Sequence, residues 1–66
     1  MDIQKTVGKN LARMRKKQGL SQEELAFRCD LHRTYISGIE RGVRNPTIGI
    51  LDKIAKALKI QAKDLL

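Results

Sequence analysis

Residues 21–42 read SQEELAFRCDLHRTYISGIERG and contain two helix-boundary signals. Ser21 followed three residues later by Glu24 is the capping-box signature of a helix start. Gly42 is a typical residue just beyond a helix end. Between these signals, only Asp30–His32 separate two segments whose apolar residues recur at helical spacing. A turn this short forces the two helices to cross steeply, so the stretch predicts a helix-turn-helix unit.

The apolar residues of this stretch fit the same prediction. Ala26 is small enough to let the two helices cross closely. The apolar side chains expected to fill the angle between the helices are Leu25, Cys29, Leu31, Ile36 and Ile39. Asp30 lies where the chain must turn, and Asp tolerates a left-handed backbone better than most residues. We therefore expect a left-handed residue at position 30.

Apolar spacing predicts further helices on both sides and no strand. The five predicted helices cover about residues 2–18, 21–29, 33–41, 48–58 and 62–66. In the fourth of them, Leu51, Ile54, Ala55 and Leu58 follow the i, i+3, i+4, i+7 pattern of one buried face. The sequence therefore predicts an all-α fold, a compact five-helix bundle that forms a single domain over residues 1–66.

The charge of the chain favours an anionic partner. Fourteen Lys and Arg face seven Asp and Glu, a formal net charge of +7. Nucleic acid or an anionic membrane surface would suit this charge, and a merely solvated basic domain is the alternative. The basic run at residues 9–17 lacks the Trp or Phe anchors of an interfacial helix. No apolar run approaches the roughly 20 residues of a membrane span, so we expect DNA and no membrane.

The sequence also argues against catalysis and metal binding. Cys29 and His32 are two potential ligands where a structural zinc site normally has four. There is no second His, no Ser beside a base and no glycine-rich phosphate loop. We expect no enzyme, metal, cofactor or small-molecule ligand. The single cysteine fits a reducing cytoplasm, and residues 1–10 show no signal peptide.

The polar face of residues 33–41 is the predicted DNA-reading surface. In a helix-turn-helix unit one helix lies in the major groove and contacts bases with residues near its N-terminus. Arg33 can bond bidentately to guanine, and Thr34 can contact a thymine methyl or a base edge. Gly38 would let the helix approach the groove, or it is a tolerated defect on a solvated face. Tyr35 is either an aromatic at the core edge or a donor to phosphate.

The chain resembles the Xre/Cro/lambda-repressor-type helix-turn-helix DNA-binding proteins over about residues 7–66. GLSQEELA, YISGIERG, RNPT and LDKIAKAL occur in the order typical of that family. LHRTYISGIERGVRN is most similar to the controller proteins of restriction–modification systems. An antitoxin, a phage-type repressor or a protein-interaction module of the same fold are the alternatives. The chain departs from the family at Asp30 and Lys59, where glycine is usual, and at Gly49, which weakens a helix.

The resemblance implies a sequence-specific transcriptional regulator of double-stranded DNA, and it implies roles for individual residues. Gln22 matches a residue that contacts phosphate from a helix N-terminus. The residues that match positions reaching bases or the nearby backbone are Arg33, Thr34, Tyr35 and Ser37. Arg44 and Asn45 match the loop that grips phosphate or the groove edge. Arg15 and Glu40 match an internal ion pair that joins the first and third helices.

A homodimer on a near-palindromic operator is the expected assembly. A chain of 66 residues buries only about 60% of the surface that its unfolded form exposes, so a partner subunit would add buried area. Leu65 and Leu66 are adjacent and cannot both face the inner stripe of one short helix, while Ile50 falls beside the stripe of its own helix. We expect Ile50, Leu65 and Leu66 at a two-fold interface. A frayed terminus with exposed leucines is the alternative.

Overall fold

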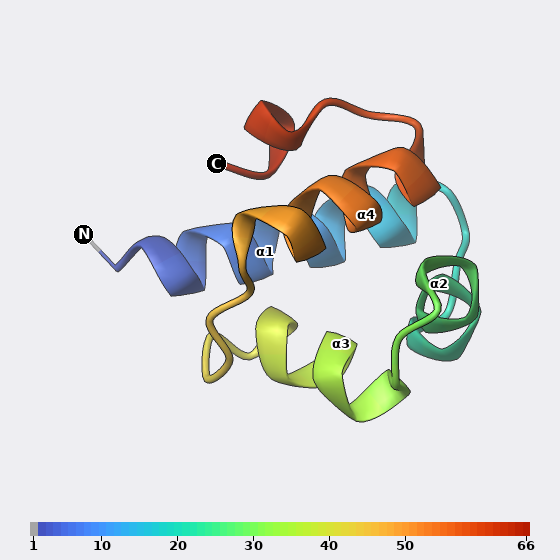
Figure 1. The fold of residues 1–66 in the computed structure, drawn as a ribbon, viewed down its shortest axis with the longest axis horizontal. Coiled ribbons are helices and arrows are strands. Elements are labelled where there is room, and N and C mark those ends of the chain that lie inside the picture. The colour runs from blue at the N-terminus through green and yellow to red at the C-terminus, as the bar shows by residue number, and fades with distance from the viewer. Residues whose placement is uncertain (1) are drawn as a thin grey trace.

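The chain folds as four α-helices followed by one turn of 3-10 helix in a computed structural model, which describes residues 2–66. The elements are α1 (Ile3–Lys17), α2 (Gln22–Cys29), α3 (Arg33–Glu40), α4 (Ile48–Leu58) and η1 (Ala62–Leu65). Residues 2–66 contain no strand, so the predicted all-α class is confirmed. Figure 1 shows α2 nearly end-on while α3 runs across the view, the steep crossing expected from the short turn.

The predicted fifth helix is corrected to a 3-10 turn. Its backbone hydrogen bonds join residues three apart, from Asp64 N to the Gln61 oxygen at 2.9 Å and from Leu66 N to the Lys63 oxygen at 3.1 Å. A segment of four residues offers little room for the longer α-helical bonds, and short 3-10 pieces of this kind are common at the ends of α-helices and as connectors. The fold is therefore a four-helix arrangement closed by η1.

Side chains satisfy the free backbone N–H groups at three helix starts. The capping box is complete, because Glu24 N donates to Ser21 Oγ at 3.0 Å and Ser21 N donates to Glu24 Oε1 at 2.9 Å. The bonds from Ser21 lower the pKa of Glu24, since they favour its charged form. Asp2 accepts from Gln4 N at 3.0 Å and Thr47 accepts from Ile50 N at 3.1 Å. Local sequence signals therefore fix where these helices begin.

The four helices end in the same way. A residue with a left-handed backbone follows each one: Gly19, Asp30, Gly42 and Lys59. The next residue then donates its N–H to a carbonyl five positions back, which is the Schellman arrangement. These donors are Leu20, Leu31, Val43 and Ile60, at 2.9 to 3.1 Å. The expected left-handed Asp30 is confirmed at φ 56° and ψ 43°, and Lys59 adopts the same conformation.

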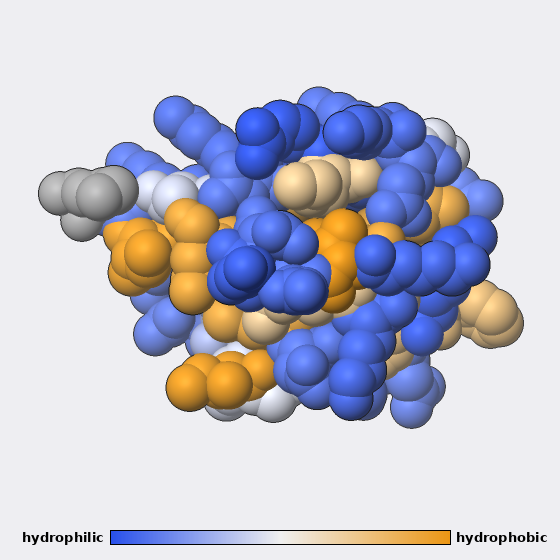
Figure 2. All heavy atoms as spheres, turned by 90° about the horizontal axis from the view of Figure 1, so that it is seen from above, coloured by the Kyte–Doolittle hydropathy of each residue, from blue (hydrophilic) through white to orange (hydrophobic). Residues whose placement is uncertain are grey.

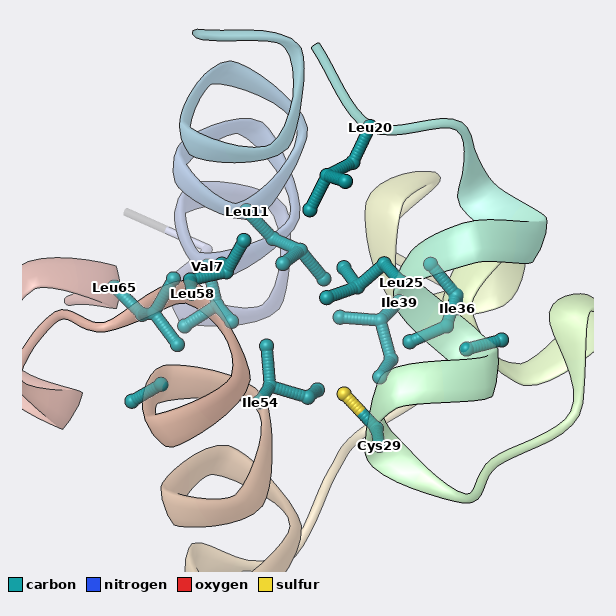
Figure 3. Close-up of a cluster of buried hydrophobic side chains, with 12 residues drawn as sticks. Val7, Leu11, Leu20, Leu25, Cys29, Ile36, Ile39, Ile54, Leu58 and Leu65 are labelled. Atoms are coloured by element: carbon teal, nitrogen blue, oxygen red, sulfur yellow. The ribbon is translucent and has the colours of Figure 1, made fainter. Parts of the chain in front are cut away.

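The core gathers apolar side chains from every element. Its buried members are Val7, Leu11, Leu20, Leu25, Ala26, Cys29, Ile36, Ile39, Ile54, Ala55, Leu58 and Leu65. Figure 3 shows most of them meeting between α1, α4 and the α2–α3 pair. Burial raises the pKa of the Cys29 thiol, which keeps it protonated and inert. Among residues 2–66, no helix combines the length and the apolar character that crossing a membrane requires.

The expected role of Leu65 in a dimer interface is wrong. Leu65 is 0% exposed, and Figure 3 shows its side chain directed toward Val7 and Leu58. The Asn10 side-chain amide donates to the Leu65 carbonyl at 3.0 Å, which ties η1 back to α1. Leu65 therefore completes the core of its own chain, while the adjacent Leu66 remains 61% exposed.

Replacing Asp30 by glycine should leave stability unchanged or raise it. Glycine adopts a left-handed backbone without the steric cost of a side chain, a gain of up to about 1 kcal/mol that the greater entropy of the unfolded chain partly offsets. Urea denaturation of Asp30→Gly measures the effect. Lys9→Gly, at an exposed position inside α1, is the control and should lose about 1 kcal/mol. If Asp30→Gly unfolds at a lower urea concentration, with an unchanged dependence of the unfolding free energy on urea, the left-handed backbone at Asp30 carries no steric cost.

Candidate nucleic-acid interface

Close packing holds α3 against α1 and α2. Ala26 of α2 is buried in the core at 3% exposure, and Ile36 and Ile39 anchor the inner face of α3 in the same core. On α1, Gly8 lies directly against the C-terminal end of α3. A Cβ at that position would overlap the carbonyl oxygen of Ile39 and lie 2.7 Å from that of Glu40. Gly8 was not singled out from the sequence, because it carries no local signal beyond its small size.

The predicted ion pair between Arg15 and Glu40 is present and fixes the end of α3. Arg15 Nε lies 2.7 Å from Glu40 Oε2, and Arg15 Nη2 donates to Glu40 Oε1 at 3.0 Å. Both side chains are about nine-tenths buried. Arg15 Nη1 also donates to the Leu20 carbonyl at 2.7 Å. The hydrogen bond and charge of Glu40 raise the pKa of Arg15, so the guanidinium stays charged inside the fold.

Gln22 joins this network. Its side-chain amide donates to Glu40 Oε1 at 3.1 Å, so the first residue of α2 is tied to the last residue of α3. The sequence did not predict this contact: the resemblance implied a phosphate contact for Gln22, and no local pattern links it to Glu40, 18 residues away. The bond holds the side chain at the α2 N-terminus, where the backbone N–H groups favour an anion.

The outward face of α3 is polar and combines arginine with the short hydroxyl side chains of Thr34 and Ser37. Arg33 and Thr34 are exposed, and Ser37 is half-buried. Thr34 Oγ1 lies 2.9 Å from His32 Nδ1, just before the first turn of the helix. Arg41 is exposed and follows Thr34 and Ser37 at the i, i+3, i+7 spacing of a single face. Arg41 is absent from the predicted site, although this spacing in the sequence could have identified it.

Gly38 is buried, which corrects its predicted place on the exposed face of α3. The side chain that covers it belongs to Arg44, in the loop after α3. A Cβ at position 38 would overlap Arg44 Cγ. Tyr35 is half-buried against the core, and Arg44 Cζ lies 5.9 Å from the centroid of its ring. The interface therefore combines α3 with the exposed loop residues Arg44 and Asn45.

Comparison with known proteins places the chain in a family. A helix-turn-helix family model matches residues 11–65. The chain belongs to the helix-turn-helix family. The family expected from the residues is therefore confirmed. The proteins similar to this helix-turn-helix protein include controller proteins of restriction-modification systems, as the sequence resemblance suggested.

Two relatives and one solved structure define that similarity. The chain is 64% identical over 50 residues to the control protein C.BamHI of Bacillus amyloliquefaciens, covering 76% of this chain and 62% of that protein. It is 44% identical over 66 residues to the control protein C.SmaI of Serratia marcescens, covering 100% of this chain and 79% of that protein. The crystal structure of the restriction-modification controller protein C.AhdI from Aeromonas hydrophila matches with a TM-score of 0.93 at 41% identity, covering 96% of each chain.

Breaking the Arg15–Glu40 pair should strongly destabilise the fold. Arg15→Ala leaves the Glu40 carboxylate buried with only Gln22 as a side-chain partner, a loss of about 3–5 kcal/mol. A double-mutant cycle with Glu40→Ala, followed by urea denaturation, should give a double loss smaller than the sum of the single losses. The exposed Asp52–Lys56 pair, at 3.1 Å, is the control and should contribute less than about 0.5 kcal/mol. Small, additive losses at Arg15 and Glu40 would contradict a structural role.

Proposed function

We propose that this helix-turn-helix protein is a sequence-specific regulator of transcription that binds double-stranded DNA as a homodimer. The observation that carries the proposal is the outward face of α3. It presents Arg33, Thr34 and Ser37 from a helix that is anchored on its inner side by buried isoleucines. A major groove about 12 Å wide admits such a helix. The net charge of +7 supplies the attraction to phosphate that this binding needs.

Each part of the interface has a proposed role. Arg33 reads guanine and Thr34 contacts a neighbouring base edge or thymine methyl. Ser37 and Tyr35 contact bases or the nearby backbone, with Tyr35 donating from its hydroxyl. Further roles at the DNA backbone fall to Gln22, Arg44 and Asn45. These contacts position the duplex, and those from the start of α3 select its sequence.

The control and controller proteins among the relatives favour the same role for this chain, without enzymatic activity. A regulator of this kind acts in the cytoplasm, which suits the free, buried thiol of Cys29. A protein-interaction module of the same fold is the competing function. Salt separates the two, because DNA affinity falls steeply as salt rises.

The proposed dimer interface lies at the end of the molecule where both termini and the start of α4 meet (Figure 1). Apolar side chains gather at this end in Figure 2. Leu66 is 61% exposed and Ile50 is half-buried there, and Ile48, at 85% exposure, adds apolar surface that was not in the predicted set. A two-fold axis through this end would bury the surface against its own copy. The two α3 helices would then lie about 34 Å apart, in successive major grooves.

Arg33→Ala should weaken operator binding by about 1–3 kcal/mol and change non-specific binding much less, because it removes a base contact. Selecting bound sites from random duplexes first supplies the operator. Both affinities are then measured at one salt concentration. Lys63→Ala, which removes one charge from η1, on the opposite side of the molecule from α3, is the control and should affect both equally (Figure 1). An equal loss on both duplexes for Arg33→Ala would make Arg33 a phosphate contact.

Replacing Ile48 and Leu66 together by Ser should shift the protein toward monomer. Both side chains are largely exposed, so the change removes interface surface without opening the core. Sedimentation velocity at micromolar concentration measures the shift, and binding to a full operator should weaken far more than binding to a half-site. Phe27→Ser, which removes an 87% exposed apolar side chain from α2, is the control. A double variant that sediments as the wild-type dimer would place the interface elsewhere.

A further inference from the structure

We propose that Gly38 is a positioning residue for DNA binding. By lacking a side chain, it lets the stem of Arg44 lie across α3 and so holds the Arg44 guanidinium beside the Tyr35 ring. The inference rests on the proposed function, because the place of Arg44 affects affinity only if the chain binds DNA. It gives Gly38 a part in recognition without any contact between Gly38 and the duplex.

Gly38 and Arg44 are closely packed. A Cβ at position 38 would overlap Arg44 Cγ, and it would lie 3.4 Å from Arg44 Cβ and 3.5 Å from Arg44 Cδ. The backbone makes a second connection between the same segments, because the Gly38 carbonyl accepts from Val43 N at 3.0 Å and from Arg44 N at 3.1 Å. The loop is therefore held at its backbone and at the stem of its arginine by one residue of α3.

The backbone at Gly38 does not itself require glycine. Among residues 2–66, the glycines with positive φ are Gly19 and Gly42, both beyond helix ends. Gly38 lies inside α3, where glycine is less favourable than alanine. Gly49 shows the contrast, since a Cβ there would meet nothing closer than Thr47 Oγ1 at 3.8 Å. What distinguishes Gly38 is the arginine stem that covers it.

This packing puts a fixed positive charge at the side of the proposed reading face. Tyr35 and Gly38 are three residues apart and share one side of α3. Arg44 crosses that side, with Cζ 5.9 Å from the centre of the Tyr35 ring. An exposed arginine ordinarily loses conformational entropy when a ligand orders it. Holding Arg44 in place before binding reduces that loss, so the contact gives the free protein a preorganised loop.

Gly38→Ala tests the proposal, with Gly49→Ala as the matched control. Alanine at Gly49 should leave the free energy of unfolding unchanged or raise it, because alanine favours a helix and a Cβ there meets nothing closer than 3.8 Å. At Gly38 the stem of Arg44 must shift to make room for the Cβ, which offsets the gain in helix propensity. Affinity for an operator half-site should fall by about tenfold or more in Gly38→Ala, the size of one lost charged contact. The half-site is used because Gly49 lies between Ile48 and Ile50 of the proposed interface, so Gly49→Ala can change binding to the full operator through the dimer. In the free protein, the NMR signals of the Arg44 side chain and the Tyr35 ring should change in Gly38→Ala and stay unchanged in Gly49→Ala.

The double variant Gly38→Ala/Arg44→Ala separates positioning from direct contact. It should bind the operator no more weakly than Arg44→Ala, since Gly38 acts through Arg44. A further loss in the double variant would place Gly38 itself at the DNA surface and overturn the proposal. So would wild-type affinity in Gly38→Ala. If Gly38→Ala is less stable, Arg44→Ala should restore it, and a failure to restore it would also overturn the proposal.

Failure of the proposed function has a different outcome. Wild-type protein would then bind no selected duplex in preference to random DNA. The NMR comparison of Gly38→Ala with Gly49→Ala would still report whether Gly38 sets the place of Arg44. Unchanged signals at Arg44 and Tyr35 would contradict the positioning in either case.

Discussion

A buried carboxylate, that of Glu40, organises the part of the fold that faces outward. Arg15 from α1 binds it through two nitrogens, and Gln22 from α2 donates to it as well. The third guanidinium nitrogen of Arg15 donates to the Leu20 carbonyl, in the turn between α1 and α2. A buried charge is tolerated only when it is paired and hydrogen-bonded, so the geometry of this cluster is demanding. Its consequence is that α3 has one position relative to α1 and α2.

Small residues then set how closely the helices approach. Ala26 is a small buried residue of α2, and Gly8 brings the α1 backbone against the end of α3. Gly38 does the same for the loop that follows α3, where the stem of Arg44 occupies the space that a side chain would fill. The interior is close-packed, so a single methyl group at Gly8 would displace a neighbouring backbone. These contacts hold the backbone of α3 closely against its neighbours, with its polar face outward.

The surface divides between two uses. The face of α3 is polar and basic, with Arg33 beside the short side chains of Thr34 and Ser37, which suits a groove in DNA. The end of the molecule that holds both termini is apolar, and Ile48 and Leu66 are largely exposed there. In the proposed dimer the apolar end sets the distance between the two α3 helices, because the two-fold axis passes through that end. Changes at the proposed interface would therefore alter operator binding by α3.

Local signals in the sequence by themselves determined where the helices lie. The capping box at Ser21 and the left-handed positions at Asp30 and Lys59 involve residues within a few positions of each other, so their hydrogen bonds follow from chemistry along the chain. Apolar periodicity likewise identified most of the core. The family resemblance identified the Arg15–Glu40 ion pair. Three features became visible in the folded molecule: which of two adjacent leucines enters the core, what covers Gly38 and what Gln22 binds. Those outcomes depend on contacts with other segments, and helical spacing fixes the face of a residue but not its neighbour.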